Sequence, residues 1–223
     1  MSPISLQSWI RGYKTIVNYD YLKRRLNLRF FFGIIKKLYG ESKSKNTPWL
    51  TLESIKIIEN WIKPTDLVLE FGSGSSTVWF SKHVKKVISI EHDPVWYKIS
   101  KKLTKRAGSK IKLHLAESKK KYLDIFNKIP DNSIDICLID GQWRRDCLLG
   151  SFKKIKKGGV IILDNAETFI PKFWKSNSFQ SGWQERGSPE RDKIKIIINE
   201  LKKWRLIVTS DVTQDTIFFI KNV

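Results

Sequence analysis

Leu69-Glu70-Phe71-Gly72-Ser73-Gly74-Ser75-Ser76-Thr77 is the stretch that decides the fold of this chain of 223 residues. It overlaps the end of an apolar, β-branched run, DLVLEF (66–71), and leads into a helical pattern over 75–83. Gly72 and Gly74 let the backbone turn sharply and come close to a ligand, which a Cβ would obstruct. Backbone N–H groups at the start of the next helix can then bind a polar ligand. The stretch therefore predicts a strand, a tight turn with a binding site, and a helix.

A second acid strengthens this prediction, because a glycine pair alone is a weak signal. Glu91 ends the next β-branched run, KVISIE (86–91), and lies 21 residues beyond Glu70. In nucleotide-binding folds, an acid at the tip of the second strand accepts hydrogen bonds from the ribose hydroxyls. The alternative is a solvated carboxylate at a strand end. With the glycine turn in place, the ribose-binding role is favoured.

Strand and helix patterns alternate from residue 49 onwards. The further β-branched runs are IKLHLA (111–116), IDICLID (134–140) and GVIILD (159–164). Helical patterns lie at 50–62, 75–83, 94–107, 118–128 and 143–157. The last of these is expected to end at Lys156-Lys157-Gly158-Gly159, where cations precede glycine. Strands separated by helices imply a parallel sheet covered on both faces, so the expected class is α/β with a Rossmann-like, doubly wound and mostly parallel sheet.

The C-terminal end departs from this alternation. Ser188-Pro189-Glu190 combines an N-cap residue, a first-turn proline and an acid, and predicts a helix that runs to about Trp204. RLIVTS (205–210) and DTIFFIK (215–221) are then separated by only four residues. That gap is too short for a crossover helix, so the two strands are expected to form an antiparallel hairpin that closes the sheet.

Two motifs carry a resemblance to a known family. Glu70-x-Gly72-x-Gly74 and Ile90-Glu91-His92-Asp93-Pro94-x-Trp96-Tyr97 resemble motifs one and two of the class I S-adenosylmethionine-dependent methyltransferases, especially bacterial members reading E-[FYW]-G-S-G-x-S-T. Matching features cover nearly all of 47–223, and one departure is Ser76 where many members have a third glycine. The resemblance implies a seven-strand methyltransferase domain over 49–223.

The resemblance also implies where S-adenosylmethionine binds. The Gly72–Ser76 loop would lie beneath the methionine part of the cofactor, Glu91 would hold the ribose, and the turn Ala116-Glu117-Ser118 would flank the adenine. The residues expected to bind the cofactor are Glu70, Gly72, Ser73, Gly74, Ser75, Ser76, Glu91, His92, Trp96, Ala116, Glu117, Ser118 and Asp140.

The acceptor side follows the fourth and fifth predicted strands, where open α/β sheets bind ligands. Asp140 is expected to lie nearest both cofactor and acceptor, and Arg144 to hold an anionic acceptor bidentately. These two are the predicted catalytic residues. The chain is accordingly interpreted as an enzyme that methylates a hydroxyl of a small molecule or glycan.

A metal site is a second hypothesis for the same strand ends. Asp140, Asp164 and Asn165 resemble the ligand set of catechol- and caffeoyl-CoA-type O-methyltransferases, and three oxygen ligands plus waters suit Mg²⁺. The lysine that this family places shortly after the first aspartate is absent, and Trp143 and Arg144 stand there instead. The alternative is that these acids end strands, cap loops and orient the cofactor amine.

Two other functions fit the residues less well than methyl transfer. An NAD-dependent oxidoreductase fingerprint needs a third glycine three residues after the second, where this chain has Thr77. A non-catalytic binder of nucleic acid or an anionic surface has no need of Glu70, Gly72, Gly74 and Glu91. Methyl transfer is favoured over both.

The basic composition has two interpretations, anionic partners or simply many lysines on solvated faces. The net charge is +20, and residues 1–48 hold ten basic and two acidic residues. This segment is expected to be a basic helical extension with a linker over 40–48. Its apolar residues, spaced as in a helix, either pack on the domain or let residues 1–46 touch a membrane surface. Nucleic acid is the less favoured partner, because few aromatics accompany the lysines after Trp96 and Tyr97.

Cysteine usage and hydropathy bear on location. Cys137 and Cys147 form no metal-ligand spacing, and Cys137 sits in an apolar run typical of a reduced core thiol. No stretch approaches the roughly 18 apolar residues that span a bilayer. A cytoplasmic location is the resulting expectation.

Overall fold

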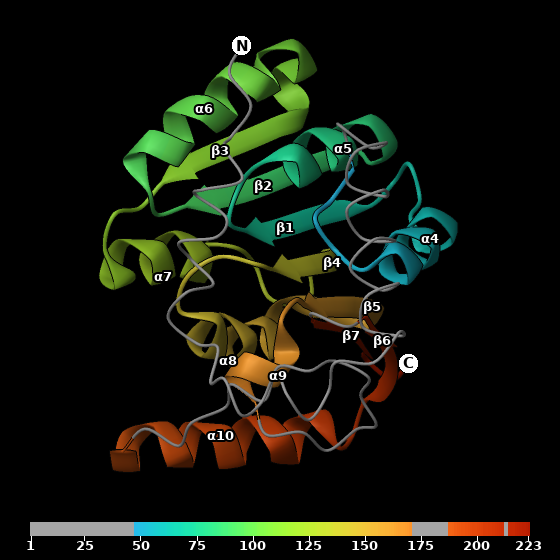
Figure 1. Ribbon diagram of the computed structural model, residues 1–223, viewed down its shortest axis with the longest axis vertical. Helices are drawn as coiled ribbons and strands as arrows, with labels where there is room; N and C mark the ends of the chain where they lie inside the picture. Colours follow the sequence, from blue (N-terminus) through green and yellow to red (C-terminus); the bar gives the residue numbers. More distant parts are fainter. Residues whose placement is uncertain (1–46, 171–186, 212–213) are drawn as a thin grey trace, which may run out of the picture.

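The computed structural model describes residues 47–170, 187–211 and 214–223. The predicted basic extension over residues 1–46 lies outside these ranges, so its helix stays a prediction. The described part is one α/β domain built around a single sheet (Figure 1).

Seven strands form the sheet in the order β3-β2-β1-β4-β5-β7-β6. Their bounds are Leu67–Phe71 (β1), Lys86–Glu91 (β2), Ile111–Leu115 (β3), Ile134–Ile139 (β4), Ile155–Leu163 (β5), Arg205–Ser210 (β6) and Asp215–Ile220 (β7). Strands β1 to β5 pair in parallel, while β7 pairs antiparallel with both β5 and β6. The predicted doubly wound sheet and its closing hairpin are therefore confirmed.

Helices cover both faces of this sheet (Figure 1). Their bounds are Leu52–Trp61 (α4), Ser75–His83 (α5), Pro94–Thr104 (α6), Lys119–Asn127 (α7), Arg144–Lys154 (α8), Ala166–Phe169 (α9) and Gly187–Leu201 (α10), with a 3₁₀ segment η1 over Lys105–Lys110. Apolar residues of α7, α8 and α10 pack on one face, and those of α4 and α5 on the other.

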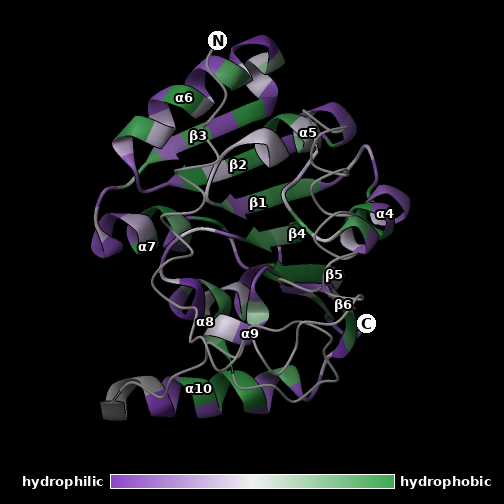
Figure 2. Ribbon diagram, in the orientation of Figure 1, coloured by the Kyte–Doolittle hydropathy of each residue, from purple (hydrophilic) through white to green (hydrophobic). Residues whose placement is uncertain are grey.

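Alternation along each strand makes this two-sided core, because successive strand residues point to opposite faces. In β1, Leu69 and Phe71 pack toward α7 and α8, whereas Val68 between them packs toward α4 and α5. Figure 2 shows the central strands as largely hydrophobic and the outer helices as mixed. Because helices cover both faces of the sheet, a ligand can reach it only at the ends of its strands.

Several predicted helix limits were wrong. The helix expected over 94–107 ends at Thr104, and the C-terminal helix expected to run to about Trp204 ends at Leu201. Helix α8 ends at Lys154 rather than at Lys156-Lys157, because Ile155 is fully buried and already pairs with Ile134 of β4. The pairing then shifts register before Val160, and Gly158 has a φ of 73°, so the glycines form an irregularity inside β5. Helix α10 begins at Gly187, one residue before the N-cap expected at Ser188.

Side chains cap the helix that leads to the site. The Asp93 carboxylate accepts hydrogen bonds from the backbone nitrogens of Val95 (2.7 Å) and Trp96 (2.9 Å), and Pro94 occupies the first turn. Such a cap fixes the start of a helix, since the first N–H groups otherwise have no partner. The start of α6 is thereby held against the end of β2.

Two negative findings concern the described ranges only. None of the helices in them has the length and apolar character that crossing a membrane requires. Cys137 and Cys147 are both buried and form no disulfide, and burial raises the pKa of the Cys137 thiol to about 12. A thiol so deeply buried acts as a small apolar core residue.

Candidate cofactor and acceptor site

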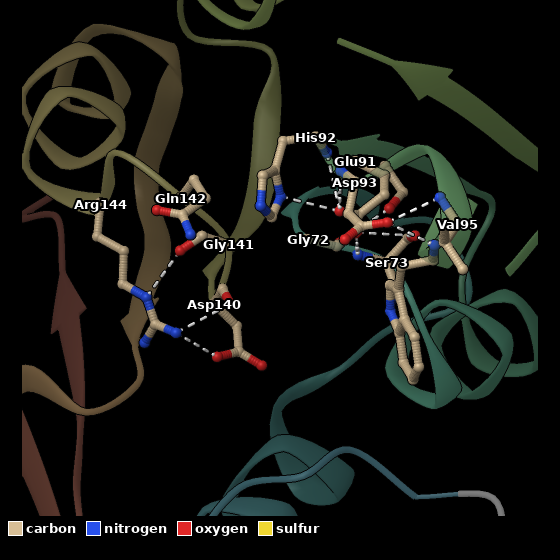
Figure 3. Close-up of polar contacts among 12 residues, drawn as sticks. Gly72, Ser73, Glu91, His92, Asp93, Val95, Asp140, Gly141, Gln142 and Arg144 are labelled. Atoms are coloured by element: carbon tan, nitrogen blue, oxygen red, sulfur yellow. Dashed lines mark hydrogen bonds and ion pairs between the residues drawn. The ribbon is translucent and has the colours of Figure 1, made fainter. Parts of the chain in front are cut away.

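A cavity of about 500 Å³ opens at the carboxyl ends of β1, β2 and β4. Figure 3 shows the Glu91 and Ser73 contacts on one side of it and the Asp140–Arg144 pair on the other. The residues that line it are Trp49, Glu70, Gly72, Ser73, Gly74, Ser75, Ser76, Glu91, His92, Asp93, Trp96, Leu103, Asp140, Gly141, Gln142 and Arg144.

The turn after β1 and the turn after β4 press against each other. Gly72 has a φ of 93°, a conformation that favours glycine, and a Cβ there would lie 3.2 Å from the Gly141 backbone. A Cβ on Gly141 would lie 2.5 Å from the Tyr122 hydroxyl and 2.7 Å from the Gly72 nitrogen. The close approach of the two turns therefore depends on glycine at both positions.

At Gly74, unlike Gly72 and Gly141, packing within the protein does not require glycine. Its backbone is extended, and a Cβ would meet the Trp96 ring only at ordinary contact distance, 3.8 Å. Nothing in the described fold thus requires glycine here. Because Gly74 lines the cavity, its bare backbone leaves room for a molecule inside it.

Glu91 is 3% exposed, and its carboxylate links the turn after β1 to the turn after β2. One oxygen accepts hydrogen bonds from the Ser73 nitrogen (2.9 Å) and hydroxyl (3.2 Å). The other accepts from the backbone nitrogens of His92 (2.8 Å) and Asp93 (2.9 Å). Backbone donors hold the acid in place, while the Ser73 hydroxyl can rotate away for a bound ligand.

Glu70 lies deeper, below the glycine turn, and is 1% exposed. The hydroxyls of Ser76 and Thr77, at the start of α5, donate to its two oxygens. Burial raises the pKa of Glu70 to about 7, against the opposing effect of these hydroxyls. The acid is therefore close to its titration point at neutral pH.

Ser73 and Trp96 complete this side of the cavity. The Trp96 indole N–H donates to the Ser73 carbonyl, and the Thr77 hydroxyl accepts from the Gly74 nitrogen at 2.9 Å. These contacts tie α5 and α6 to the glycine turn. Most of the predicted cofactor residues are thus brought to one wall of the cavity.

Three of them are not. Ala116, Glu117 and Ser118 follow β3 and do not line the cavity, although the Ala116 nitrogen donates to the Glu91 carbonyl at 2.8 Å. Five lining residues were missed from the sequence: Trp49, Asp93, Leu103, Gly141 and Gln142. Gly141 and Gln142 directly follow Asp140, so their place after a parallel strand was the signal that could have found them.

On the acceptor side, Asp140 pairs with Arg144, whose Nη2 donates to the Asp140 Oδ1 at 2.8 Å. The Asp140 pKa is raised by burial, with Arg144 opposing that rise. Figure 3 shows the other carboxylate oxygen turned away from Arg144. Asp140 therefore offers one oxygen to the cavity and one to the guanidinium.

Asp164 and Asn165 lie behind this pair rather than facing the cavity. The Asp164 Oδ1 accepts from the Thr216 hydroxyl (2.6 Å) and the Gln214 amide (3.3 Å), both from the C-terminal hairpin. Burial, reinforced by the Asp140 charge, raises the pKa of Asp164 to about 8. The Asn165 Oδ1 accepts from Arg144 at 3.2 Å.

The predicted Mg²⁺ site therefore gains no support. A metal ligand needs a free lone pair turned toward the ion, whereas the Arg144 guanidinium stands among the three expected ligands. No group of three or more His, Cys, Asp or Glu side chains in the described ranges could hold a metal ion.

Two side-chain-bearing residues at this edge adopt the left-handed conformation. Trp143 has a φ of 51° and Asn165 a φ of 49°, and each immediately precedes a helix, α8 and α9 respectively. The Trp143 ring packs on Tyr122 with 5.1 Å between ring centroids. Such conformations are costly for a large residue and persist where the surroundings hold them.

Comparison with known proteins agrees with this architecture. A family model described as "Methyltransferase domain" matches residues 69–166. A comparison with curated protein sequences gave no match. Among solved structures, an O-methyltransferase from Bacillus cereus in complex with SAH is similar, with 15% identity, 91% of this chain and 96% of that chain covered, and a TM-score of 0.57.

Two further structures show how widely the fold is shared. A methyltransferase from Geobacter sulfurreducens has 13% identity, covers 100% of both chains and gives a TM-score of 0.54. The tRNA (m1A58) methyltransferase TrmI from Aquifex aeolicus has 15% identity over 77% of this chain and 68% of that chain, with a TM-score of 0.52. At these identities the likeness is one of fold.

The seven-stranded sheet, the glycine turn and the two strand-end acids define the class: the chain has the fold of the class I S-adenosylmethionine-dependent methyltransferases. Within it, residues 69–166 match the methyltransferase domain family. This matched segment runs from β1 to the start of α9 and holds most of the residues that line the cavity.

Proposed function

We propose that this protein transfers a methyl group from S-adenosylmethionine to a hydroxyl of a small molecule or glycan. The observation that carries the proposal is that the Glu91 carboxylate and the Gly72–Ser76 turn line the same cavity as Asp140. The residues proposed to bind the cofactor and the carboxylate proposed to bind the acceptor therefore line the same cavity.

The cofactor would be held by the turn after β1 and by Glu91. The cavity fits it at two points: Gly74 leaves a place that a Cβ would partly fill, and Glu91 presents an acid to a ribose. Glu70 would add negative charge near the cationic end of the cofactor when it is ionised. When bound, the cofactor supplies a methyl group already activated on a sulfonium.

Asp140 is the proposed residue for the acceptor. Its free oxygen lies at the cavity, so it can accept the hydrogen bond of an incoming hydroxyl and take its proton as the oxygen is methylated. A raised pKa makes a carboxylate a better base, and the Asp140 pKa is raised by burial. The protein otherwise contributes alignment and exclusion of water.

A hydroxyl is favoured over other acceptors by this carboxylate and by one comparison, since the similar Bacillus cereus protein is an O-methyltransferase. The role first expected for Arg144, bidentate binding of an anionic acceptor, is not part of the proposal. Its N–H groups are already bonded within the chain. Asp140 is therefore the one acceptor-side residue proposed to touch the reacting atoms.

Thermal unfolding of the purified chain with S-adenosylmethionine, S-adenosylhomocysteine or NAD tests the cofactor. At a ligand concentration of about 100 times Kd, the sulfur cofactors should stabilise the fold by about 2.7 kcal/mol, and NAD should not. A shift with NAD and none with either sulfur compound would refute the proposal. Radiolabelled methyl transfer to a panel of hydroxylated small molecules and glycans would then identify the acceptor class.

A further inference from the structure

Arg144 uses every N–H group of its guanidinium inside the chain. Its side chain is 11% exposed. The five hydrogen bonds run from Nε to the Gly141 carbonyl, from Nη1 to the Asp164 carbonyl and the Asn165 Oδ1, and from Nη2 to the Asp140 carbonyl and Oδ1. Five is the full number of donors that an arginine has. The guanidinium therefore has a structural role at the acceptor side of the cavity and has no N–H group left to bind a substrate.

Its contacts join the ends of β4 and β5. Asp140 directly follows β4 and Asp164 directly follows β5, and Arg144 donates to the backbone carbonyl of each. Asn165 is the N-cap residue of α9. The Phe169 ring, at the end of α9, covers the guanidinium with 4.7 Å between its central carbon and the ring centroid. This stacking limits the access of water to the cation.

Three of the contacted residues, Asp140, Asp164 and Asn165, are the ones whose pattern suggested Mg²⁺. Without a cation between them, two nearby carboxylates would repel each other. Here burial and then the Asp140 charge raise the Asp164 pKa, and the Arg144 guanidinium opposes the rise in the pKa of both acids. The guanidinium is bound to the Asp140 carboxylate at 2.8 Å and to the Asn165 amide oxygen at 3.2 Å.

We propose that Arg144 takes the place of a divalent cation at the acceptor wall, so that cofactor binding and methyl transfer need no metal ion. The inference rests on the proposed function. Arg144 acts as a positioning residue: it fixes one Asp140 oxygen and leaves the other at the cavity. A guanidinium does this at any metal concentration, because it remains protonated and carries its donors in a rigid plane.

The first measurement is Mn²⁺ binding to the full-length parent, followed by electron paramagnetic resonance in the absence of any cofactor. The expected result is no bound Mn²⁺ that Mg²⁺ can displace. Binding of one Mn²⁺ by the parent that is lost in a folded Asp140→Asn would overturn the proposal. Calorimetry should also give the same affinity for S-adenosylhomocysteine in chelator and in Mg²⁺, within about twofold.

The second measurement uses Arg144→Ala, with Arg145→Ala as the matched control on the same turn of α8. Arg144→Ala should lower the melting temperature, and millimolar Mn²⁺ or methylguanidinium should restore part of the loss. Neither cation should change Arg145→Ala. A folded Arg144→Ala that is as stable as the parent, or that neither cation rescues, would show that the guanidinium is not acting as the balancing charge.

These outcomes are separable from failure of the proposed function. A chain that binds no S-adenosylhomocysteine in any buffer would refute the methyltransferase proposal, whereas the Mn²⁺ titration and the rescue experiment contain no cofactor. Metal-dependent cofactor binding in the parent would refute only the role of Arg144.

Discussion

Gly72 and Gly141 lie back to back where β1 and β4 end, so closely that a Cβ on Gly141 would come within 2.7 Å of the Gly72 nitrogen. Gly72 begins the turn of the cofactor wall, and Gly141 follows Asp140 on the acceptor wall. The spacing between the two walls of the site is therefore set by a backbone contact that admits no side chain.

Gly141→Ala should consequently damage the fold itself. The added methyl would meet the Tyr122 hydroxyl and the Gly72 and Phe71 backbone below 3.0 Å. Forcing a methyl into a tight site costs about 1–3 kcal/mol. Urea unfolding should show this loss of stability, and equal midpoints for parent and variant would contradict the prediction.

Gly74→Ala is expected to have the opposite profile. A Cβ there meets only the Trp96 ring at 3.8 Å, so the free energy of unfolding should change little. Gly74 lines the cavity, however, so the added methyl should lower the affinity for S-adenosylhomocysteine by about tenfold or more. Unchanged affinity would mean that the cofactor does not lie against this turn.

Glu91→Gln should weaken cofactor binding while the chain stays folded. The amide keeps one acceptor oxygen but replaces the other by an NH₂ group, which cannot accept the ribose hydroxyl or the backbone N–H groups that now donate to that oxygen. Losing a hydrogen bond to a charged acceptor costs about 1.5–3 kcal/mol, or about 10- to 150-fold in Kd. Calorimetry measures this change, and far-ultraviolet circular dichroism checks the fold. Glu59→Gln, an exposed residue of α4, is the control and should bind as the parent does.

Glu70 should make the stability of the protein depend on pH. Its pKa is raised from 4.5 to about 7, so the fold favours the protonated form. The stabilisation is fully present below the unfolded pKa and is lost as the pH rises through the folded one. The loss approaches about 3 kcal/mol, since each pKa unit corresponds to about 1.4 kcal/mol.

Glu70→Gln isolates this contribution, because glutamine does not titrate. Between about pH 5 and about pH 8, the free energy of unfolding should fall more for the parent than for the variant. Asp164 also titrates in this window, but it does so in both proteins and cancels in the difference. Parallel pH profiles would show that Glu70 is ionised throughout.

Deleting residues 1–46 should leave cofactor binding intact. The glycine turn, Glu91 and all seven strands lie after Trp49. The first described residue, Thr47, is already tied to the site, because its carbonyl accepts from the Ser75 hydroxyl at 3.1 Å. The truncated chain should bind S-adenosylhomocysteine as the parent does, whereas an aggregated product would show that the deleted apolar residues belong to the core.

Much of the fold was predictable because its signals are local. Buried parallel strands need continuous apolar runs, and helices need a period near 3.6, so each element is visible in its own residues. Strand β2 and helix α5 have the predicted bounds, Lys86–Glu91 and Ser75–His83. The four-residue gap before β7 likewise required the observed hairpin. The paired acids Glu70 and Glu91 were visible for the same reason, since Glu70 is the next-to-last residue of β1 and Glu91 the last of β2.

What the sequence alone could not decide depended on contacts between distant segments. The three-residue set Asp140, Asp164 and Asn165 is compatible with a metal site and also with a group of strand-end polar residues. Only the packed sheet shows that Arg144 lies among them and that the C-terminal hairpin supplies Thr216 to Asp164. The start of β5 at Ile155 was hidden in the same way, because it is set by pairing with Ile134. Local pattern determines which elements form and where they end, whereas the partner of a buried charge is chosen by the neighbours that packing brings to it.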